Sequence, residues 1–127
     1  VREGQCRGKC TTINTFYDEA TKTSIAKCQQ IQGQPIIIRN EEQKFYWKSH
    51  VKSDAWTVIG LVCRTNSTER EWADGSRVDY KSGFLDPIFY FPCLTGEAWV
   101  LHSDGNWSVF TTHMGHQAWS TDVFCST

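Results

Sequence analysis

The stretch WVLHSDGNWSVFT, from Trp99 to Thr111, is typical of two short strands joined by a turn. Apolar residues flank Ser103-Asp104-Gly105-Asn106, and Asp-Gly is among the strongest short hairpin signals because both residues tolerate positive φ. Two further apolar runs, residues 56–61 and 123–125, predict a buried strand and a closing strand. The second half of the chain is therefore expected to be mainly antiparallel β-structure.

The first half of the chain carries two helix patterns. The first helix is expected to start with Asp18 as its N-cap and to stop at Gly33 and Pro35. Its apolar residues recur every three positions, at Ile25, Cys28 and Ile31. The β-branched segment 36–38 that follows predicts a short buried strand.

The second helix is expected to open at Asn40. Acidic residues at 41 and 42 oppose the partial positive charge of the helix N-terminus, and Gln43 has the spacing of a capping box. The inner face is expected to be marked by Phe45 and Lys48 with Val51 or Lys52. Of the consecutive rings at 45–47, one or two are expected in the core and one partly exposed.

The order of these elements indicates the fold class. Helices come first, and the strands that follow enclose residues 63–93, which are rich in Gly, Pro, Asn and Asp. This order favours an α+β domain over a parallel doubly wound sheet. No linker, repeat or low-complexity tract divides the chain into parts.

Composition and charge exclude several classes of partner. The chain has 127 residues, of which 13% are aromatic, so a packed core is expected rather than disorder. Thirteen Lys and Arg against 14 Asp and Glu give a net charge of -1, which argues against nucleic acid or an anionic membrane as the main partner. No apolar run approaches the roughly 20 residues that cross a bilayer. A start at Val1 is typical of a processed or excised piece.

The cysteines indicate an oxidising compartment. There are six, at positions 6, 10, 28, 63, 93 and 125, and no C-x-x-C pair points to a metal site. Three disulfides are expected, although six cysteines allow 15 pairings. Asn66 and Asn106 each begin an N-x-[ST] sequon, which predicts a glycoprotein. The chain is therefore expected to be extracellular, either secreted or part of the ectodomain of a membrane protein.

Six dispersed segments have the order and spacing of one known family. They are the Cys28 helix with GQPIII at 33–38, NEE at 40–42, WTVIGL at 56–61, WADGS at 72–76 followed by Asp79, Tyr80 and Phe84, GNW at 105–107, and VFC at 123–125. Together they resemble the C-type lectin-like domain over almost the whole chain. WTVIGL looks like the family's W-I-G-L signature with one extra residue. The resemblance implies one domain over residues 1–127, with an N-terminal extension at 1–10 and a long-loop region at 64–96.

The resemblance also implies disulfide pairings. In the family a bridge joins the first helix to the last strand, which here is Cys28–Cys125. On the chain-entropy model such a long loop contributes roughly 4–5 kcal/mol. Cys10 stands where longer members of the family have an N-terminal cysteine. Cys6 is its one unassigned partner, and a bridge from Cys6 to an outside thiol is an open alternative.

A second bridge is expected in an unusual place. Most members have a bridge across the hairpin, whose cysteines would fall near Ala98 and near Thr112 or His113, and these positions hold no cysteine. Cys63 follows the WTVIGL segment and Cys93 precedes the hairpin, so we expect these two to pair at the base of the long loop.

The calcium site of sugar-binding members is only partly matched. Those members use a Glu-Pro-Asn or Gln-Pro-Asp triplet, a following Glu, and an Asn-Asp pair after the hairpin tryptophan. Here Asp86-Pro87-Ile88 stands at the triplet, Glu97 could match the Glu, and Ser108-Val109 replaces the pair. Calcium prefers six to eight oxygen ligands, so no metal or other cofactor is expected. Asp74 and Asp79 with Asp86 could form an unrelated calcium site, but we expect them to be surface turn residues.

The long loop holds the candidate ligand-binding residues, which are Asp86, Ile88, Phe89, Tyr90 and Phe91. Concentrated aromatics mark interfaces when they are exposed. The alternative is that residues 88–91 form a short strand with alternate rings buried. The predicted function is extracellular recognition of a protein ligand without calcium. The alternatives are a carbohydrate-binding lectin, calcium-dependent or working by aromatic stacking, and a structural module of a mosaic extracellular protein.

No enzyme is predicted. His113-Met114-Gly115-His116 lacks the spacing of four and the Glu of the H-E-x-x-H metalloproteases, and Gly115 disfavours a helix there. No G-x-S-x-G or phosphate-binding loop is present in the sequence, and no catalytic residue is expected.

Overall fold

The computed structural model describes residues 8–53, 56–63, 69–81, 87–93, 96–110 and 118–126. The strands in these ranges are β1 (Gly8–Phe16), β2 (Gln34–Pro35), β3 (Leu61–Cys63), β4 (Arg70–Trp72), β5 (Ala98–Leu101), β6 (Trp107–Phe110) and β7 (Ala118–Ser126). The helices are α1 (Tyr17–Gln29) and α2 (Glu41–Lys48), and a 3-10 turn, η1, spans Pro87–Tyr90. Two helices with three antiparallel sheets confirm the predicted α+β class.

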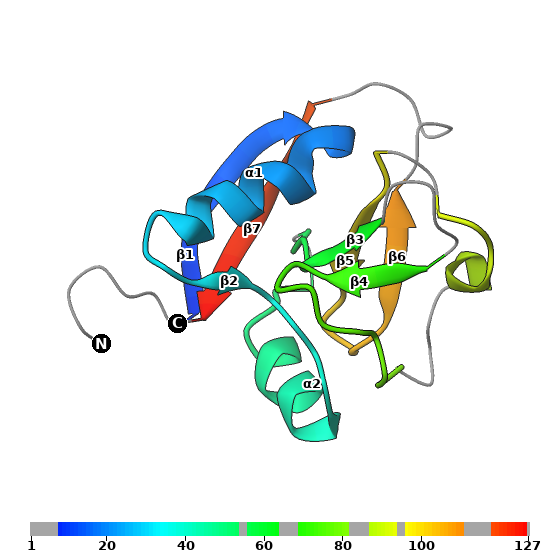
Figure 1. Ribbon diagram of the computed structural model, residues 1–127. Coiled ribbons are helices and arrows are strands. Elements are labelled where there is room, and N and C mark those ends of the chain that lie inside the picture. The colour runs from blue at the N-terminus through cyan, green and yellow to red at the C-terminus, as the bar shows by residue number, and fades with distance from the viewer. Residues whose placement is uncertain are drawn as a thin grey trace.

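The first and last of these strands lie side by side (Figure 1). β1 pairs antiparallel with β7 from Gly8↔Cys125 to Phe16↔Ala118, and β2 pairs with the other edge of β7. β7 is longer than the predicted closing strand at 123–125, and β1 was not predicted at all. Its first residues lie in the expected extension at 1–10. The partner strand is at the far end of the chain, so no local sequence pattern predicts this pairing.

α1 continues directly from β1. Phe16 is its N-cap, in an extended conformation and without a side-chain hydrogen bond, so the prediction of Asp18 as N-cap is wrong. The end of the paired strand fixes where the helix begins. The inner face has fully buried residues four apart, at Ala20, Ser24 and Cys28. Ile25 is only half-buried, because it lies beside this stripe.

α1 ends before Gly33, as predicted, but the residue with positive φ is Gln32 (φ 59°). The strand predicted at 36–38 is wrong, because pairing with β7 ends at Pro35. Ile36 and Ile38 are nevertheless fully buried, as the apolar pattern requires. These residues line the core without joining a sheet.

α2 begins as the sequence predicts and faces the core differently. The Asn40 side chain accepts a hydrogen bond from the Gln43 backbone N–H at 2.8 Å, and Gln43 Oε1 accepts one from the Arg39 N–H at 2.6 Å. The inner face consists of Lys44, Trp47 and Val51. The predicted inner residue Phe45 is 56% exposed, so that assignment is wrong. The larger indole of Trp47 fills the space below the helix, which turns Phe45 outward.

The predicted hairpin is confirmed. β5 and β6 pair from Ala98↔Phe110 to Leu101↔Trp107, and Gly105 has positive φ (92°) in the turn. The run at 56–61 is mostly buried, but its ladder begins only at Leu61, where β3 pairs with β4. Thr57 and Val58 make isolated bridges instead, so the longer strand predicted there is wrong.

Both described disulfides match the predicted pairings. Cys28–Cys125 joins α1 to β7 with 5.5 Å between the Cα atoms, and Cys63–Cys93 joins β3 to the chain after η1 with 5.6 Å. Cys6 and the side chain of Cys10 lie outside the described part of the structure. In the described ranges, no helix has the length and apolar character needed to cross a membrane.

Candidate functional site

The predicted binding segment is a helical turn packed on the core. η1 begins at Pro87, whose ring restricts φ to values that suit a turn, so the strand considered for residues 88–91 is wrong. Ile88 and Phe89 are half-buried against the main core cluster, and Phe91 is 61% exposed. Asp86 and the side chain of Tyr90 lie outside the described residues.

Arg70 on β4 fixes the backbone of this segment. Nη1 donates to the Phe89 carbonyl at 2.6 Å and to the Phe91 carbonyl at 3.1 Å, and Nη2 makes a longer contact with the Ile88 carbonyl at 3.4 Å. The Arg70 side chain is 1% exposed. Sequence reasoning did not single out this residue, although it stands at an inward position of β4, two residues before buried Trp72.

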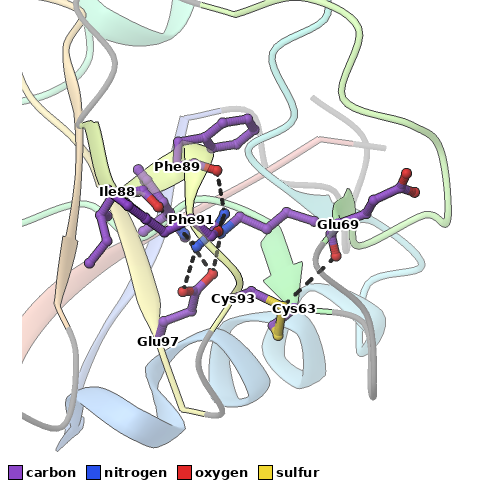
Figure 2. Close-up of polar contacts among 9 residues, drawn as sticks. Cys63, Glu69, Ile88, Phe89, Phe91, Cys93 and Glu97 are labelled. Carbon is purple, nitrogen blue, oxygen red and sulfur yellow. Dashed lines mark hydrogen bonds and ion pairs between the residues drawn. A yellow bond between two sulfur atoms is a disulfide. The ribbon is translucent and has the colours of Figure 1, made fainter.

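Glu97, immediately before β5, completes the cluster (Figure 2). Its Oε1 accepts from Arg70 Nε at 2.5 Å and its Oε2 accepts from Arg70 Nη2 at 3.0 Å, so the ion pair is bidentate. Trp99 Nε1 also donates to Oε1, at 3.0 Å. The Glu97 side chain is 1% exposed. Both carboxylate oxygens therefore have donors inside the protein.

Two aromatic rings lie against the guanidinium. Its central carbon lies 5.2 Å from the ring centroid of Phe89 and 5.3 Å from that of Trp99. The two rings meet edge to face, with centroids 5.6 Å apart. Such contacts attract a cation to the ring faces. The rings also separate the ion pair from solvent, which strengthens its electrostatic attraction.

The disulfide lies beside this cluster. Cys63–Cys93 ties the end of β3 to the residue two positions after Phe91, and Cys93 Sγ lies 3.9 Å from the Glu69 carbonyl oxygen. Together the bridge and the ion pair hold β3, β4, η1 and the start of β5 against one another.

Comparisons with known proteins agree with this architecture. A solved structure of the mouse scavenger receptor C-type lectin carbohydrate-recognition domain superposes with a TM-score of 0.63 over 93% of this chain and 85% of that chain, at 22% sequence identity. The chain has a C-type lectin-like fold. Neither a family model nor a curated protein matches its sequence, so the likeness is one of fold.

The described residues at the expected calcium positions either carry no side-chain oxygen or contact other side chains. Glu97, the one described carboxylate that could match the family's calcium ligands, is paired with Arg70. Ile88 carries no side-chain oxygen and Val109 is buried in the core. The Ser108 hydroxyl is hydrogen-bonded to His102 Nε2 at 2.5 Å. Among the residues that the structure describes, no group of three His, Cys, Asp or Glu side chains could hold a metal ion.

Asp74 belongs to the WADGS turn of the domain. Its Oδ1 accepts from the Ser76 N–H at 2.9 Å and from the Ser76 hydroxyl at 2.6 Å, and its Oδ2 pairs with Arg39. Partial burial raises the pKa of the Asp74 carboxyl, but the hydrogen bonds from Ser76 and the charge of Arg39 outweigh it and leave the pKa below its usual value. Asp74 therefore organises a turn that ties the segment before α2 to the chain after β4.

Tyr80 contacts α2 itself. Its hydroxyl donates to Glu41 Oε2 at 3.1 Å, and partial burial together with this carboxylate raises the pKa of Tyr80. The predicted glycosylation site Asn106 lies half-buried in the hairpin turn, where its Nδ2 donates to Asp104 Oδ2 at 3.1 Å. Asn66 and the histidines of residues 113–116 lie outside the described part of the chain.

Proposed function

We propose that this domain is an extracellular recognition module that binds a protein ligand without calcium, through the long-loop segment predicted at residues 86–91. The proposal depends mainly on one observation. Phe91 is 61% exposed at the end of a segment whose backbone carbonyls at 88, 89 and 91 all contact one buried guanidinium. An exposed ring on a fixed backbone brings contact area with little loss of conformational freedom on binding.

The surroundings of Phe91 support a protein ligand. Ile88 and Phe89 in the same segment are only half-buried, and Pro92, which follows Phe91 in the chain, is also exposed. Aromatic residues are enriched at the centres of protein interfaces. The buried Arg70–Glu97 pair supports calcium independence, because the matching carboxylate is already neutralised by an internal cation.

A glycan ligand is the second candidate. The similar mouse domain is named as a carbohydrate-recognition domain, and an exposed ring such as Phe91 can stack on the apolar face of a sugar. In this chain such binding would depend on ring contacts and hydrogen bonds, because the described residues do not supply a calcium ligand set.

The test uses two screens and a matched pair of variants. The domain is screened against secreted ectodomains and on a glycan array, each with calcium and with chelator. Phe91→Ala is compared with Phe45→Ala, since Phe45 is similarly exposed, at 56%, but lies on α2. We expect binding to an ectodomain that survives chelator and falls at least about tenfold in Phe91→Ala, the loss of about 1.4 kcal/mol, with Phe45→Ala little changed.

Three results contradict the proposal. Equal binding by Phe91→Ala and wild type removes Phe91 from the site. Array signals that disappear with chelator establish a calcium-dependent lectin instead. Signals in neither screen favour a structural module.

A further inference from the structure

The guanidinium of Arg70 lies where five oxygen atoms converge from two other segments of the chain. The guanidinium of Arg70, from β4, contacts both carboxylate oxygens of Glu97 and the main-chain carbonyl oxygens of Ile88, Phe89 and Phe91, at 2.5 to 3.4 Å. Figure 2 shows these carbonyls and the carboxylate directed toward the same point. We infer that Arg70 does the work of a bound cation and holds the 87–91 segment in its binding conformation. The inference rests on the proposed function in taking this segment as the binding surface.

The oxygen atoms need a positive partner. A carboxylate and carbonyl oxygens all carry negative charge or partial charge, and the Arg70 and Glu97 side chains are each only 1% exposed. At such burial water has little access to the Glu97 carboxylate, so removal of its cation costs free energy. Arg70 compensates the oxygen atoms together, which couples the position of η1 to β4 and to the start of β5.

An arginine suits this position better than a lysine. The guanidinium is planar and has five N–H donors in a fixed fork, whereas an ammonium has three donors at one point. Nε and Nη2 face the Glu97 carboxylate, while Nη1 reaches the Phe89 and Phe91 carbonyls. The flat group also lies against the rings of Phe89 and Trp99. Its charge does not depend on calcium concentration.

Removal of the Arg70 side chain has a specific consequence. Arg70→Ala leaves Glu97 and the three carbonyls around a space that has lost its cation. Carboxylate and carbonyl oxygens are the ligands that calcium prefers, at about 2.3–2.6 Å. The oxygens are spaced for a guanidinium and must move inward to reach a metal ion, so we expect weak binding, with a Kd of about 1 mM.

The experiment compares wild type with Arg70→Ala, Arg70→Lys and the double variant R70A/E97Q, with no ligand present. Thermal melting and limited proteolysis followed by mass spectrometry report stability and cleavage within residues 87–93. Each protein is measured with chelator, with about 10 mM calcium, and with ethylguanidinium, which replaces the atoms that Arg70→Ala removes.

We expect wild type to melt at the same temperature with calcium and with chelator. Arg70→Ala should melt lower and be cleaved faster within 87–93. Ethylguanidinium should reverse part of both changes. Calcium should stabilise Arg70→Ala by a few degrees but not R70A/E97Q, which lacks the carboxylate. Arg70→Lys, which keeps the charge without the fork, should also be cleaved faster than wild type, and it provides the test if Arg70→Ala does not fold.

Three outcomes overturn the inference. The first is a wild-type melting temperature that falls when chelator is added. The second is cleavage of Arg70→Lys at the wild-type rate, and the third is an Arg70→Ala protein that neither ethylguanidinium nor calcium stabilises. All three are read without a ligand. Failure of the proposed function, seen as a Phe91→Ala domain that binds normally, is therefore separate from failure of this inference.

Discussion

Glu97→Gln is a sharp test of how the long loop is held. The substitution keeps the size of the side chain but replaces one carboxylate oxygen by an amide that donates, and it leaves the Arg70 cation buried without a counter-charge. Both side chains are 1% exposed, and three donor contacts at 2.5 to 3.0 Å reach the carboxylate. Breaking one side of a buried pair costs about 3–5 kcal/mol, a large share of the 5–15 kcal/mol typical of a domain.

The assay is urea unfolding followed by tryptophan fluorescence, with the disulfides intact. A double-mutant cycle with Arg70→Met separates the pair from its surroundings. We expect the loss of unfolding free energy in the double variant R70M/E97Q to be smaller than the sum of the two single losses. The difference should be about 2 kcal/mol or more. Arg39→Met is the control, since its exposed pair with Asp74 should contribute about 1 kcal/mol or less. A loss below about 1 kcal/mol in Glu97→Gln would refute the view that this ion pair is buried and structural.

Three other perturbations test the fold and the turns. Replacing the Cys28–Cys125 bridge by alanines should cost about 4.7 kcal/mol against about 3.6 kcal/mol for the Cys63–Cys93 bridge, because they close loops of 97 and 30 residues; denaturant midpoints in the opposite order would contradict this. Gly105→Ala should destabilise more than Gly75→Ala, because both have positive φ but only at Gly105 would a Cβ meet another side chain, at 2.6 Å; equal melting temperatures would exclude the close contact. Asp74 has a lowered folded-state pKa, so its contribution is present above pH 3.8 and lost as pH falls below it. The melting temperature of Asp74→Asn should therefore fall less steeply than that of wild type as the pH is lowered from about 5 to about 2. Parallel curves of melting temperature against pH would show that Asp74 has no such role.

The elements that could be predicted from the sequence are those specified by near neighbours. The Asn40 cap and Gln43 lie three residues apart, and the Asp104-Gly105 turn joins strands that directly follow each other. In each case the residues that signal the element also make the contact. The Cys28–Cys125 and Cys63–Cys93 pairings needed more than local patterns, and they came from the family resemblance and the order of the segments around them.

The elements that were missed depend on distant partners. β1 is a strand because β7 pairs with it. The pairing extends to Phe16, so α1 begins there without a capping side chain. Phe45 and Trp47 compete for the space under α2, and only the shape of the core decides that Trp47 fills it. Neither feature can be predicted from the propensities of neighbouring residues.

Arg70 shows why a site can be harder to predict than a fold. The first and last residues of β4 are buried, and Glu71 between them is less buried. Arg70 and Trp72 therefore lie on the inward face of the strand. A buried guanidinium needs an acceptor that is also shielded from water, and Glu97 supplies it only because β5 brings it there from 27 positions away. An arginine two residues before a core tryptophan in a short strand is thus a usable signal. The same signal does not name the partner, because the fold decides which carboxylate reaches the guanidinium.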